Sequence, residues 1–361
     1  MKKNILIVDD SALMRRVMSD IVESDKRFRT ADMAKDGLEA FELLIEKEYD
    51  AVLLDINMPR MTGLELLEQL QKNKMKARIV MVSTLTREGA AETIRALELG
   101  AFDFVTKPGN YLEARGIGFK QALLEMLAAA VMPRSGEKSQ EPVCRKTVRA
   151  LKDTEVSRNT AEAGGSRVVA LACSTGGPRS LQSVLPLIPA DIDAGILIVQ
   201  HMPPGFTNSL ALRLNEMSRI RVKEAEDGEM IENGCAYIAP GGMHMKIARD
   251  GMKRHRVLLT KDAPVGGLRP CANLMYESLL DCGFDEIICV VMTGMGSDGT
   301  EGIRRLSTGK STYVIAQDEA TSVVYGMPKA IADACLADAV VPLDKLSESI
   351  MKNVGVHENG C

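Results

Sequence analysis

The sequence lacks several features that would place it in common classes of protein. No uncharged apolar stretch reaches about 18 residues, so we expect no membrane-spanning helix. Lysines precede the first apolar run in MKKNILIVDD, but two aspartates end that run too soon for a signal peptide. The formal net charge is only -4 and basic residues form no block, so nucleic acid is not a favoured partner.

The cysteines also lack a diagnostic arrangement. All eight are scattered, without a CxxC pair or a spacing typical of metal ligands. Because no secretion signal is present, we expect these thiols to stay reduced in a cytoplasmic protein. Hydrophobic residues make up 45% and charged residues 26% of the chain, which is typical of a globular protein.

Apolar segments alternate with amphipathic ones along most of the chain. Within residues 1–125 the runs ILIV, AVLL, RIVMV and FDFV predict buried strands, and SALMRRVMSDIVES and GLELLEQLQKN between them have helical spacing. A second alternation begins at VVALAC and continues through AGILIVQH, IICVVMTG and STYVIAQD. Since 361 residues also exceed one ordinary core, we expect two α/β domains built on mostly parallel sheets.

A polar segment separates the two alternations. From Pro133 to Ser166 the composition is mixed in charge and ends in Gly-Gly-Ser, which predicts a linker with a helical patch at KTVRALKD. The segment from Cys235 to Asp262 predicts antiparallel hairpin strands inserted in the second, doubly wound sheet. The expected boundaries are 1–125 for the first domain, 126–165 for the linker, 166–350 for the second domain and 351–361 for a tail.

Polar side chains follow the predicted strands of the first domain. They are Asp9 and Asp10, then Asp55, Ser83 and Lys107. Carboxyl ends of parallel strands meet at one edge of a sheet, so these groups are expected to lie together. Either the acids are solvated loop residues, or a cation such as Mg²⁺ sits among them. A carboxylate can also accept a phosphoryl group when a metal, a lysine and a hydroxyl neutralise the added charge.

The motifs VDDS, LLDINMPRMTG, MVST and FVTKP carry a specific resemblance. Residues 1–125 resemble the receiver domain of bacterial two-component response regulators, which has a flavodoxin-like fold. The resemblance implies that Asp55 accepts a phosphoryl group from a histidine kinase. The Mg²⁺ ligands it implies are Asp10, Asp55 and the backbone carbonyl of Asn57, with Asp9 acting through water.

Three further roles in the first domain follow from the same resemblance. Ser83 and Lys107 are expected to contact the phosphoryl group, and Phe104 to be the switch aromatic. A cis peptide bond is expected between Lys107 and Pro108, since X-Pro bonds tolerate cis at low cost.

The strands of the second domain end at a different set of groups. VVALAC ends at Ser174, GILIVQ at His201, and IICVVMTG just before Asp298. A serine, an imidazole and a carboxylate can together activate a hydroxyl. The order Ser, His, Asp matches none of the common hydrolase orders, and no G-x-S-x-G motif is present.

Each of these residues also has a structural alternative. Ser174 could only cap the following helix, His201 could be a structural histidine, and Asp298 could be a turn or cap acid. His244 is the rival base, because it follows a glycine turn in APGGMHM.

A second resemblance involves the motifs ACSTGGP, QHMPPGFT, YIAPGGMHM, VVMTGMGSDGTEG and AQDEATSVVYGMP. Residues 166–345 resemble the methylesterase domain of the CheB family of bacterial chemotaxis. The resemblance implies a triad of Ser174, His201 and Asp298, with the backbone amides of Thr175 and Met295 as oxyanion donors. It implies no cofactor for the esterase reaction.

The cysteine beside the predicted nucleophile poses a separate question. Adjacent side chains of an extended segment point to opposite faces, so Cys173 should face the core while Ser174 faces substrate. The chain departs from the family in LRPCANLMYES, where serine and aspartate are expected near Cys271 and Asn273. Arg269 in the same segment is a candidate receptor contact.

The two resemblances together imply a phosphorylation-regulated enzyme. It would hydrolyse glutamate γ-methyl esters, and deamidate glutamines, on the cytoplasmic helices of methyl-accepting chemoreceptors. The alternatives are a response regulator whose second domain only binds a protein, and a general carboxylesterase. We expect neither nucleic-acid binding nor insertion into the membrane.

Overall fold

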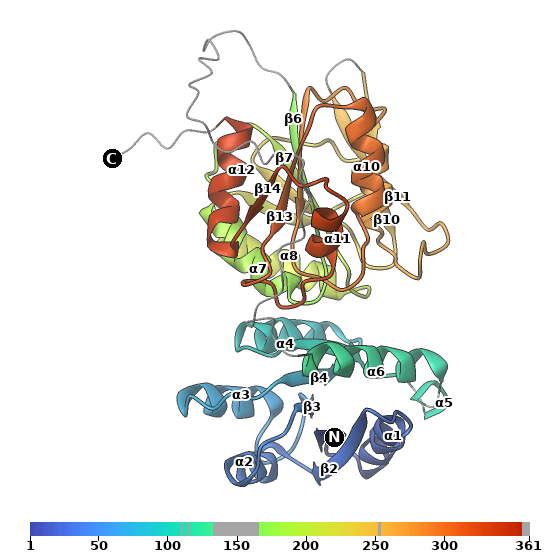
Figure 1. Cartoon of the computed structure of the whole chain (residues 1–361), viewed down its shortest axis with the longest axis vertical. Helices are drawn as coiled ribbons and strands as arrows, with labels where there is room; N and C mark the ends of the chain where they lie inside the picture. Colours follow the sequence, from blue (N-terminus) through green and yellow to red (C-terminus); the bar gives the residue numbers. More distant parts are fainter. Residues whose placement is uncertain (110, 115, 133–165, 252–253, 356–361) are drawn as a thin grey trace. The chain divides into compact units, whose positions relative to one another are not determined.

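The computed structural model describes residues 1–109, 111–114, 116–132, 166–251 and 254–355. The chain divides into two compact units, Met1–Arg134 and Ser135–Cys361 (Figure 1). The predicted helical patch KTVRALKD lies outside the described residues. None of the helices in the described part of the chain has the length and apolarity that a membrane crossing would need.

The first unit is built on a parallel sheet with the order β2-β1-β3-β4-β5. The strands are β1 (Lys3–Val8), β2 (Phe28–Ala34), β3 (Ala51–Asp55), β4 (Ile79–Ser83) and β5 (Asp103–Thr106). All residues of β3 and β4 are buried, as expected of strands covered on both faces. The apolar runs therefore predicted β1, β3, β4 and β5 correctly, whereas no run predicted β2, in which most residues between the buried ends are exposed or half-buried.

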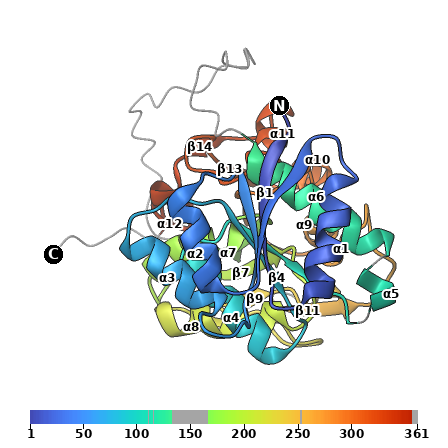
Figure 2. The same cartoon turned by 90° about the horizontal axis from the view of Figure 1, so that it is seen from below.

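Helices cover both faces of this sheet. They are α1 (Ala12–Glu23), α2 (Gly37–Glu46), α3 (Gly63–Lys72), α4 (Arg87–Glu98), α5 (Tyr111–Ala114) and α6 (Ile117–Val131). Figure 2 shows α1 and α6 on one side of β1 and α2 and α3 on the other. Helix α6 continues past residue 125, the expected boundary, because Leu127 and Ala130 are part of the core.

The second unit contains a parallel sheet with the order β14-β13-β12-β6-β7-β9-β8. The strands are β6 (Arg167–Cys173), β7 (Gly195–Gln200), β8 (Arg221–Glu224), β9 (Cys235–Ile238), β12 (Glu286–Val291), β13 (Thr312–Gln317) and β14 (Ala339–Val341). The strand order reverses between β6 and β12. In open α/β sheets, such a reversal is where ligands bind, beyond the carboxyl ends of the strands.

Two groups of helices sandwich this sheet, as Figure 1 shows. On one side lie α7 (Gly177–Val184), α8 (Phe206–Met217) and α12 (Leu346–Val354). On the other lie α10 (Thr300–Gly309) and α11 (Met327–Asp333), and α9 (Ala272–Ser278) packs against α10. The α/β class predicted from the alternating runs is confirmed for both units.

The hairpin prediction is correct for two strands and wrong for one. The strands β10 (His244–Arg249) and β11 (His255–Thr260) pair antiparallel and form a sheet of their own. Strand β9, by contrast, pairs parallel with β7 and β8 in the main sheet. A short apolar run does not specify its partner, so only the tertiary packing decides between the two sheets.

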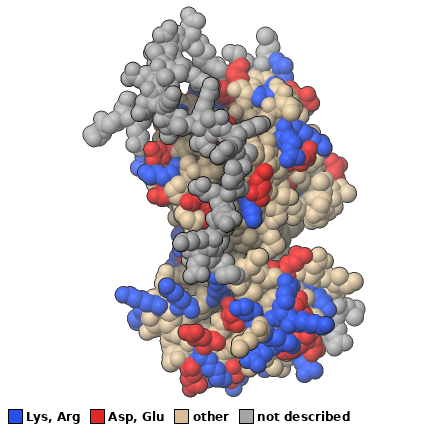
Figure 3. Space-filling model, in the orientation of Figure 1, with Lys and Arg blue, Asp and Glu red and all other residues tan. Residues whose placement is uncertain are grey.

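Charged side chains are spread over the surface. On the face shown in Figure 3, acidic and basic residues are intermingled on both units, without a large block of one sign.

Candidate functional site

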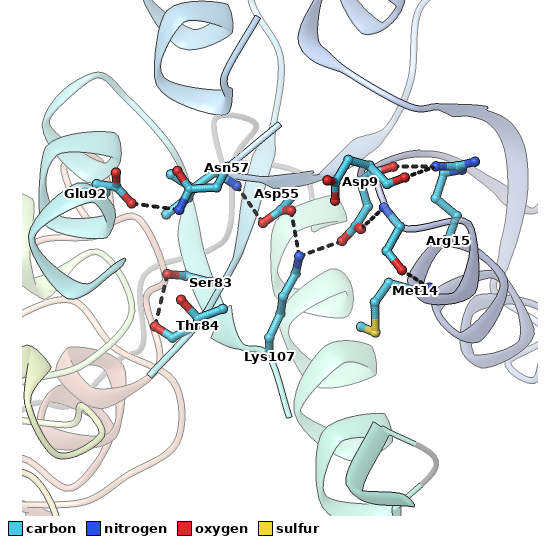
Figure 4. Close-up of polar contacts among 12 residues, drawn as sticks. Asp9, Met14, Arg15, Asp55, Asn57, Ser83, Thr84, Glu92 and Lys107 are labelled. Carbon is cyan, nitrogen blue, oxygen red and sulfur yellow. Dashed lines mark hydrogen bonds and ion pairs between the residues drawn. The ribbon is translucent and has the colours of Figure 1, made fainter. Parts of the chain in front are cut away.

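The first unit gathers an acidic cluster at the carboxyl edge of its sheet (Figure 4). Asp9 and Asp10 follow β1, and Asp55 ends β3. One carboxylate oxygen of each lies within 4.8 Å of the others. The Lys107 ammonium is 2.8 Å from Asp9 and 2.6 Å from Asp55. The arrangement concentrates oxygen ligands of the kind that Mg²⁺ prefers.

Burial and charge oppose each other in this cluster. Burial raises the pKa of Asp55 to about 6, although the Lys107 ammonium attracts the ionised form. Burial acts to lower the pKa of Lys107, but the charges of Asp55 and Asp9 outweigh it and hold that pKa above its usual value. A divalent cation would relieve the repulsion between the carboxylates, so the residues present fit such an ion.

The remaining predicted residues of the first unit lie around this cluster. The Ser83 hydroxyl is bonded to the Gly89 carbonyl of α4 at 3.2 Å and accepts a hydrogen bond from Thr93 at 2.7 Å. The Asn57 side chain donates to Glu92 of α4 at 3.2 Å. Phe104 is buried in β5. Ser83 and Asn57 are therefore both hydrogen-bonded to α4.

The prediction of a cis bond before Pro108 is wrong. Among the described residues the cis peptide bond is Arg269–Pro270, and Lys107–Pro108 is trans. Trans is the lower-energy isomer of an X-Pro bond. With this bond in trans, the Lys107 ammonium still contacts both Asp9 and Asp55.

The second unit brings the other three predicted residues to the carboxyl edge of its sheet. Ser174 follows β6, His201 follows β7, and Asp298 lies in the loop between β12 and α10. His201 Nε2 is 2.8 Å from Asp298 Oδ2, and both side chains are largely buried. In the serine protease arrangement the carboxylate holds Nδ1 instead. Here Nδ1 takes part in no hydrogen bond with the described residues, so this nitrogen is available to accept a proton.

Asp298 is held by the start of α9. Its Oδ2 accepts the Ala272 amide at 2.6 Å, and its Oδ1 accepts the Asn273 and Gly299 amides, each at 3.0 Å. Burial acts to raise the pKa of Asp298, but the hydrogen bond and charge of His201, together with these amides, keep that pKa below its usual value. The carboxylate is thus fixed in the ionised form that can orient an imidazole.

Ser174 does not cap the following helix. The N-cap of α7 is Gly176, in the left-handed region at φ 76°, and no side chain caps that helix. The Ser174 hydroxyl forms no hydrogen bond within the described part of the chain, including none to His201. The alternative that Ser174 is only a helix cap is therefore wrong, and its hydroxyl is available to a substrate.

The predicted oxyanion donors are the backbone amides of Thr175 and Met295. The described residues provide no acceptor for the backbone N–H of Thr175 or of Met295. The backbone next to Met295 packs closely against Ser174. A Cβ on Gly294 would lie only 2.8 Å from Ser174 Cβ. The Thr293 hydroxyl donates to the Thr175 carbonyl at 2.9 Å and so ties the two loops together. Such paired amides suit a developing oxyanion.

The other candidates from the sequence, Cys173, His244 and Arg269, are engaged in contacts of their own or buried. The Cys173 side chain is fully buried, and burial raises the pKa of its thiol. His244 is also buried, and its Nε2 contacts the Ala263 carbonyl at 3.1 Å. The Arg269 guanidinium is bonded to the carbonyls of Lys261 and Asp262 in its own loop.

The two positions at which we expect a departure from the family pattern have clear partners. The Cys271 thiol donates to Asp298 Oδ1 at 3.2 Å. The Asn273 side chain accepts from the Gly299 and Gly302 amides and so caps α10. The Cys271 thiol therefore contacts the carboxylate directly, and the Asn273 side chain fixes the start of the helix that follows Asp298. Sequence reasoning marked these positions but missed both contacts.

Most described cysteines carry free, buried thiols: Cys173, Cys235, Cys271, Cys282 and Cys289. Cys144 and Cys361 lie outside the described residues.

Comparison with known proteins agrees with both resemblances. Residues 169–350 match the family described as CheB methylesterase, and residues 5–114 match the response regulator receiver domain. A protein-glutamate methylesterase/protein-glutamine glutaminase of Pyrococcus horikoshii is 41% identical over 99% of this chain and 95% of its own length. One of Syntrophomonas wolfei is 39% identical over 97% of this chain and 99% of its own length.

A solved structure extends this comparison to the fold. The CheB methylesterase catalytic domain of Thermotoga maritima is 39% identical, with a TM-score of 0.50, and the match covers 53% of this chain and 99% of that one. The sequence motifs thus identified the family correctly. The chain belongs to the CheB methylesterase family and carries a response regulator receiver domain ahead of its methylesterase domain.

Proposed function

We propose that the protein hydrolyses glutamate γ-methyl esters, and deamidates glutamines, on the cytoplasmic helices of chemoreceptors. The observation that carries this proposal is the buried contact between His201 and Asp298, at the same sheet edge as a serine whose hydroxyl has no hydrogen-bond partner among the described residues. The names of the full-length relatives support the substrate class. Because such substrates are cytoplasmic, we place the protein in the cytoplasm.

The proposed reaction is an acyl transfer in two halves. Ser174 Oγ attacks the ester carbonyl carbon while His201 Nδ1 takes its proton, and Asp298 stabilises the imidazolium. The amides of Thr175 and Met295 hold the oxyanion. Collapse expels methanol, which receives the proton from His201.

Water completes the cycle. It attacks the acyl-enzyme with His201 again as the base, and collapse restores Ser174 and releases a free glutamate carboxylate. Deamidation follows the same route with ammonia as the leaving group. The chain's own groups are sufficient for each of these steps, so the proposal includes no cofactor for the esterase.

In the first unit we propose Asp55 as the acceptor of a phosphoryl group from a histidine kinase. Asp10, Asp55 and the Asn57 carbonyl would hold Mg²⁺, with Asp9 acting through water. The ion would neutralise charge on the phosphoryl oxygens. Lys107 and Ser83 would contact the phosphoryl group, and Phe104 would respond as the switch aromatic.

The link between the units is proposed to be inhibitory. A flexible linker of about 30 residues has a typical span of about 30 Å, enough for the receiver to cover the catalytic strand ends. Phosphorylation adds about two negative charges near Asp55 and can reorganise the adjacent loops. The covered state would then become less favourable, and activity would rise.

One experiment tests the activity. The full-length protein is incubated with chemoreceptors carrying labelled methyl groups, and methanol release is measured with and without a small-molecule phosphodonor. We expect release that the phosphodonor stimulates and that Ser174→Ala abolishes. No release from a folded protein that still binds receptor would favour the alternative of a non-catalytic binding domain.

A further inference from the structure

The geometry points to Gln200 as a positioning residue. Its side chain holds the backbone of the nucleophile, Ser174, at a fixed distance from the backbone of the base, His201. This inference rests on the function proposed above, because it concerns how Ser174 and His201 are aligned. Gln200 ends β7 and is buried, directly before His201. It forms no contact with Asp298, so its role differs from that of the triad acid.

The side-chain amide of Gln200 bonds three groups at once. Its Nε2 donates to the Ser174 carbonyl at 3.1 Å and to the His201 carbonyl at 3.2 Å. Its Oε1 accepts the Cys173 thiol at 3.0 Å. Both Nε2 donors and the Oε1 acceptor are therefore used, which satisfies a buried amide. One planar group thus fixes the separation of two carbonyls that follow different strands.

Gly177 supplies an independent observation. A Cβ at this position would lie 2.0 Å from Gln200 Oε1. Gly177 does not have a positive φ, so its backbone conformation does not require glycine. The missing side chain instead makes room for the Gln200 amide. Gly177 also donates its own N–H to the Ser174 carbonyl at 2.7 Å, so two donors converge on that oxygen.

The expected consequence is kinetic. Ser174 and His201 share no hydrogen bond of their own, so their alignment depends on main-chain contacts such as these. A misplacement of about 1 Å from a change away from the chemistry can cost about 100-fold in rate. Loss of the Gln200 amide should therefore lower kcat while leaving receptor binding, and hence KM, nearly unchanged.

The first test compares Gln200→Met with the unchanged full-length protein, using methanol release from methyl-labelled receptors. Methionine is similar in length but lacks the amide. We expect kcat to fall about 10- to 100-fold with KM within about twofold. Tyr237→Phe is the control, since it removes a buried hydroxyl that contacts Met230 and Glu232 instead. It should keep kcat within about twofold even if the protein is less stable.

Gln200→Glu adds a second measurement, the dependence of activity on pH, which would not change if Gln200 were only structural. A protonated carboxyl keeps one O–H donor, whereas a carboxylate has none. The activity of Gln200→Glu relative to the unchanged protein should therefore rise as pH falls. A ratio that stays flat over the accessible pH range would count against the inference.

A double-mutant cycle gives the sharpest result. Gly177→Ala should lower kcat by displacing the amide, yet it should cost little further in a Gln200→Ala background, where only the Cys173 sulfur, 3.0 Å from the added Cβ, has to shift. Additive losses, or a Gln200→Met enzyme with normal kcat, would overturn the proposal. Ser174→Ala is measured in parallel. If that variant remains active, the proposed function has failed, whereas a dead Ser174→Ala beside a normal Gln200→Met refutes this inference alone.

Discussion

Nε2 of His201 lies 2.8 Å from Oδ2 of Asp298, although 97 positions separate the two residues along the chain. The parallel sheet creates this contact by bringing the ends of β7 and β12 to one edge. The pairing of an imidazole with an ionised, buried carboxylate favours a role for His201 as base and for Asp298 as its orienter.

We therefore predict unequal losses of activity within this pair. Replacing His201 by alanine should lower kcat on the order of 10⁶-fold, and replacing Asp298 about 10⁴-fold, because the acid only orients and stabilises the base. His244→Ala is the matched control, since that histidine is buried but contacts Ala263. Steady-state methanol release checks all three variants. A dead His244→Ala beside an active His201→Ala would mean that the base is misassigned.

The depressed pKa of Asp298 predicts how stability depends on pH. Its carboxylate is ionised more readily in the folded than in the unfolded protein, so its stabilising contribution is complete above the unfolded pKa of 3.8. The contribution is lost as pH falls through the lower folded pKa. The difference in unfolding free energy between the unchanged protein and Asp298→Asn should therefore shrink in acid. Denaturant unfolding at several pH values measures it, and a difference that grows in acid would contradict this sign.

The identity of the nucleophile has its own prediction. Ser174→Ala should lower activity on the order of 10⁶-fold, whereas Cys173→Ala should retain most of it. Burial raises the pKa of the Cys173 thiol and raises that of Cys271 to about 12, so both are protonated near neutral pH. Since the thiolate is the reactive form, iodoacetamide should leave the native enzyme active. An inactive, folded Cys173→Ala with an active Ser174→Ala would reverse the assignment.

Inhibition by the receiver predicts a gain of activity on truncation. Deleting residues 1–150 should give an esterase that is active without phosphodonor, and Asp55→Asn should make the full-length protein insensitive to it. Each 1.4 kcal/mol by which phosphorylation disfavours the covered state changes the open-to-covered ratio about tenfold. Methanol release from the three proteins is the measurement. If the truncated enzyme is no faster than the unphosphorylated full-length one, activation must come from receptor docking or a direct allosteric effect.

Two glycines of the receiver predict opposite changes in stability. A Cβ on Gly63 would lie 2.2 Å from the Asp55 carbonyl oxygen, so Gly63→Ala should destabilise the receiver by about 1–3 kcal/mol. Gly118 is exposed in α6 with open space around it, so Gly118→Ala should stabilise by up to about 1 kcal/mol. Because the chain has no tryptophan, calorimetry is the suitable measurement. Equal effects of the two changes on stability would show that the close approach of Gly63 to the Asp55 carbonyl does not determine the cost of adding a side chain.

Two errors made from the sequence share one cause. Strand β9 was expected in a hairpin but pairs in the main sheet. Lys107–Pro108 was expected to be cis but is trans. The sheet that β9 joins depends on which distant strands it meets, and the isomer before Pro108 depends on the packing around it. Local patterns carry neither kind of information.

The sequence by itself determined the α/β class and the chemistry-bearing residues at the strand ends. Buried parallel strands require continuous apolar runs, and functional groups follow where those runs stop. Only the tertiary structure decided that Nε2 of His201 holds Asp298, that Cys271 and Asn273 support that loop, and that Gln200 joins the segments containing Ser174 and His201. These are side-chain hydrogen bonds, many of them between distant positions. Their geometry depends on packing that no periodicity encodes.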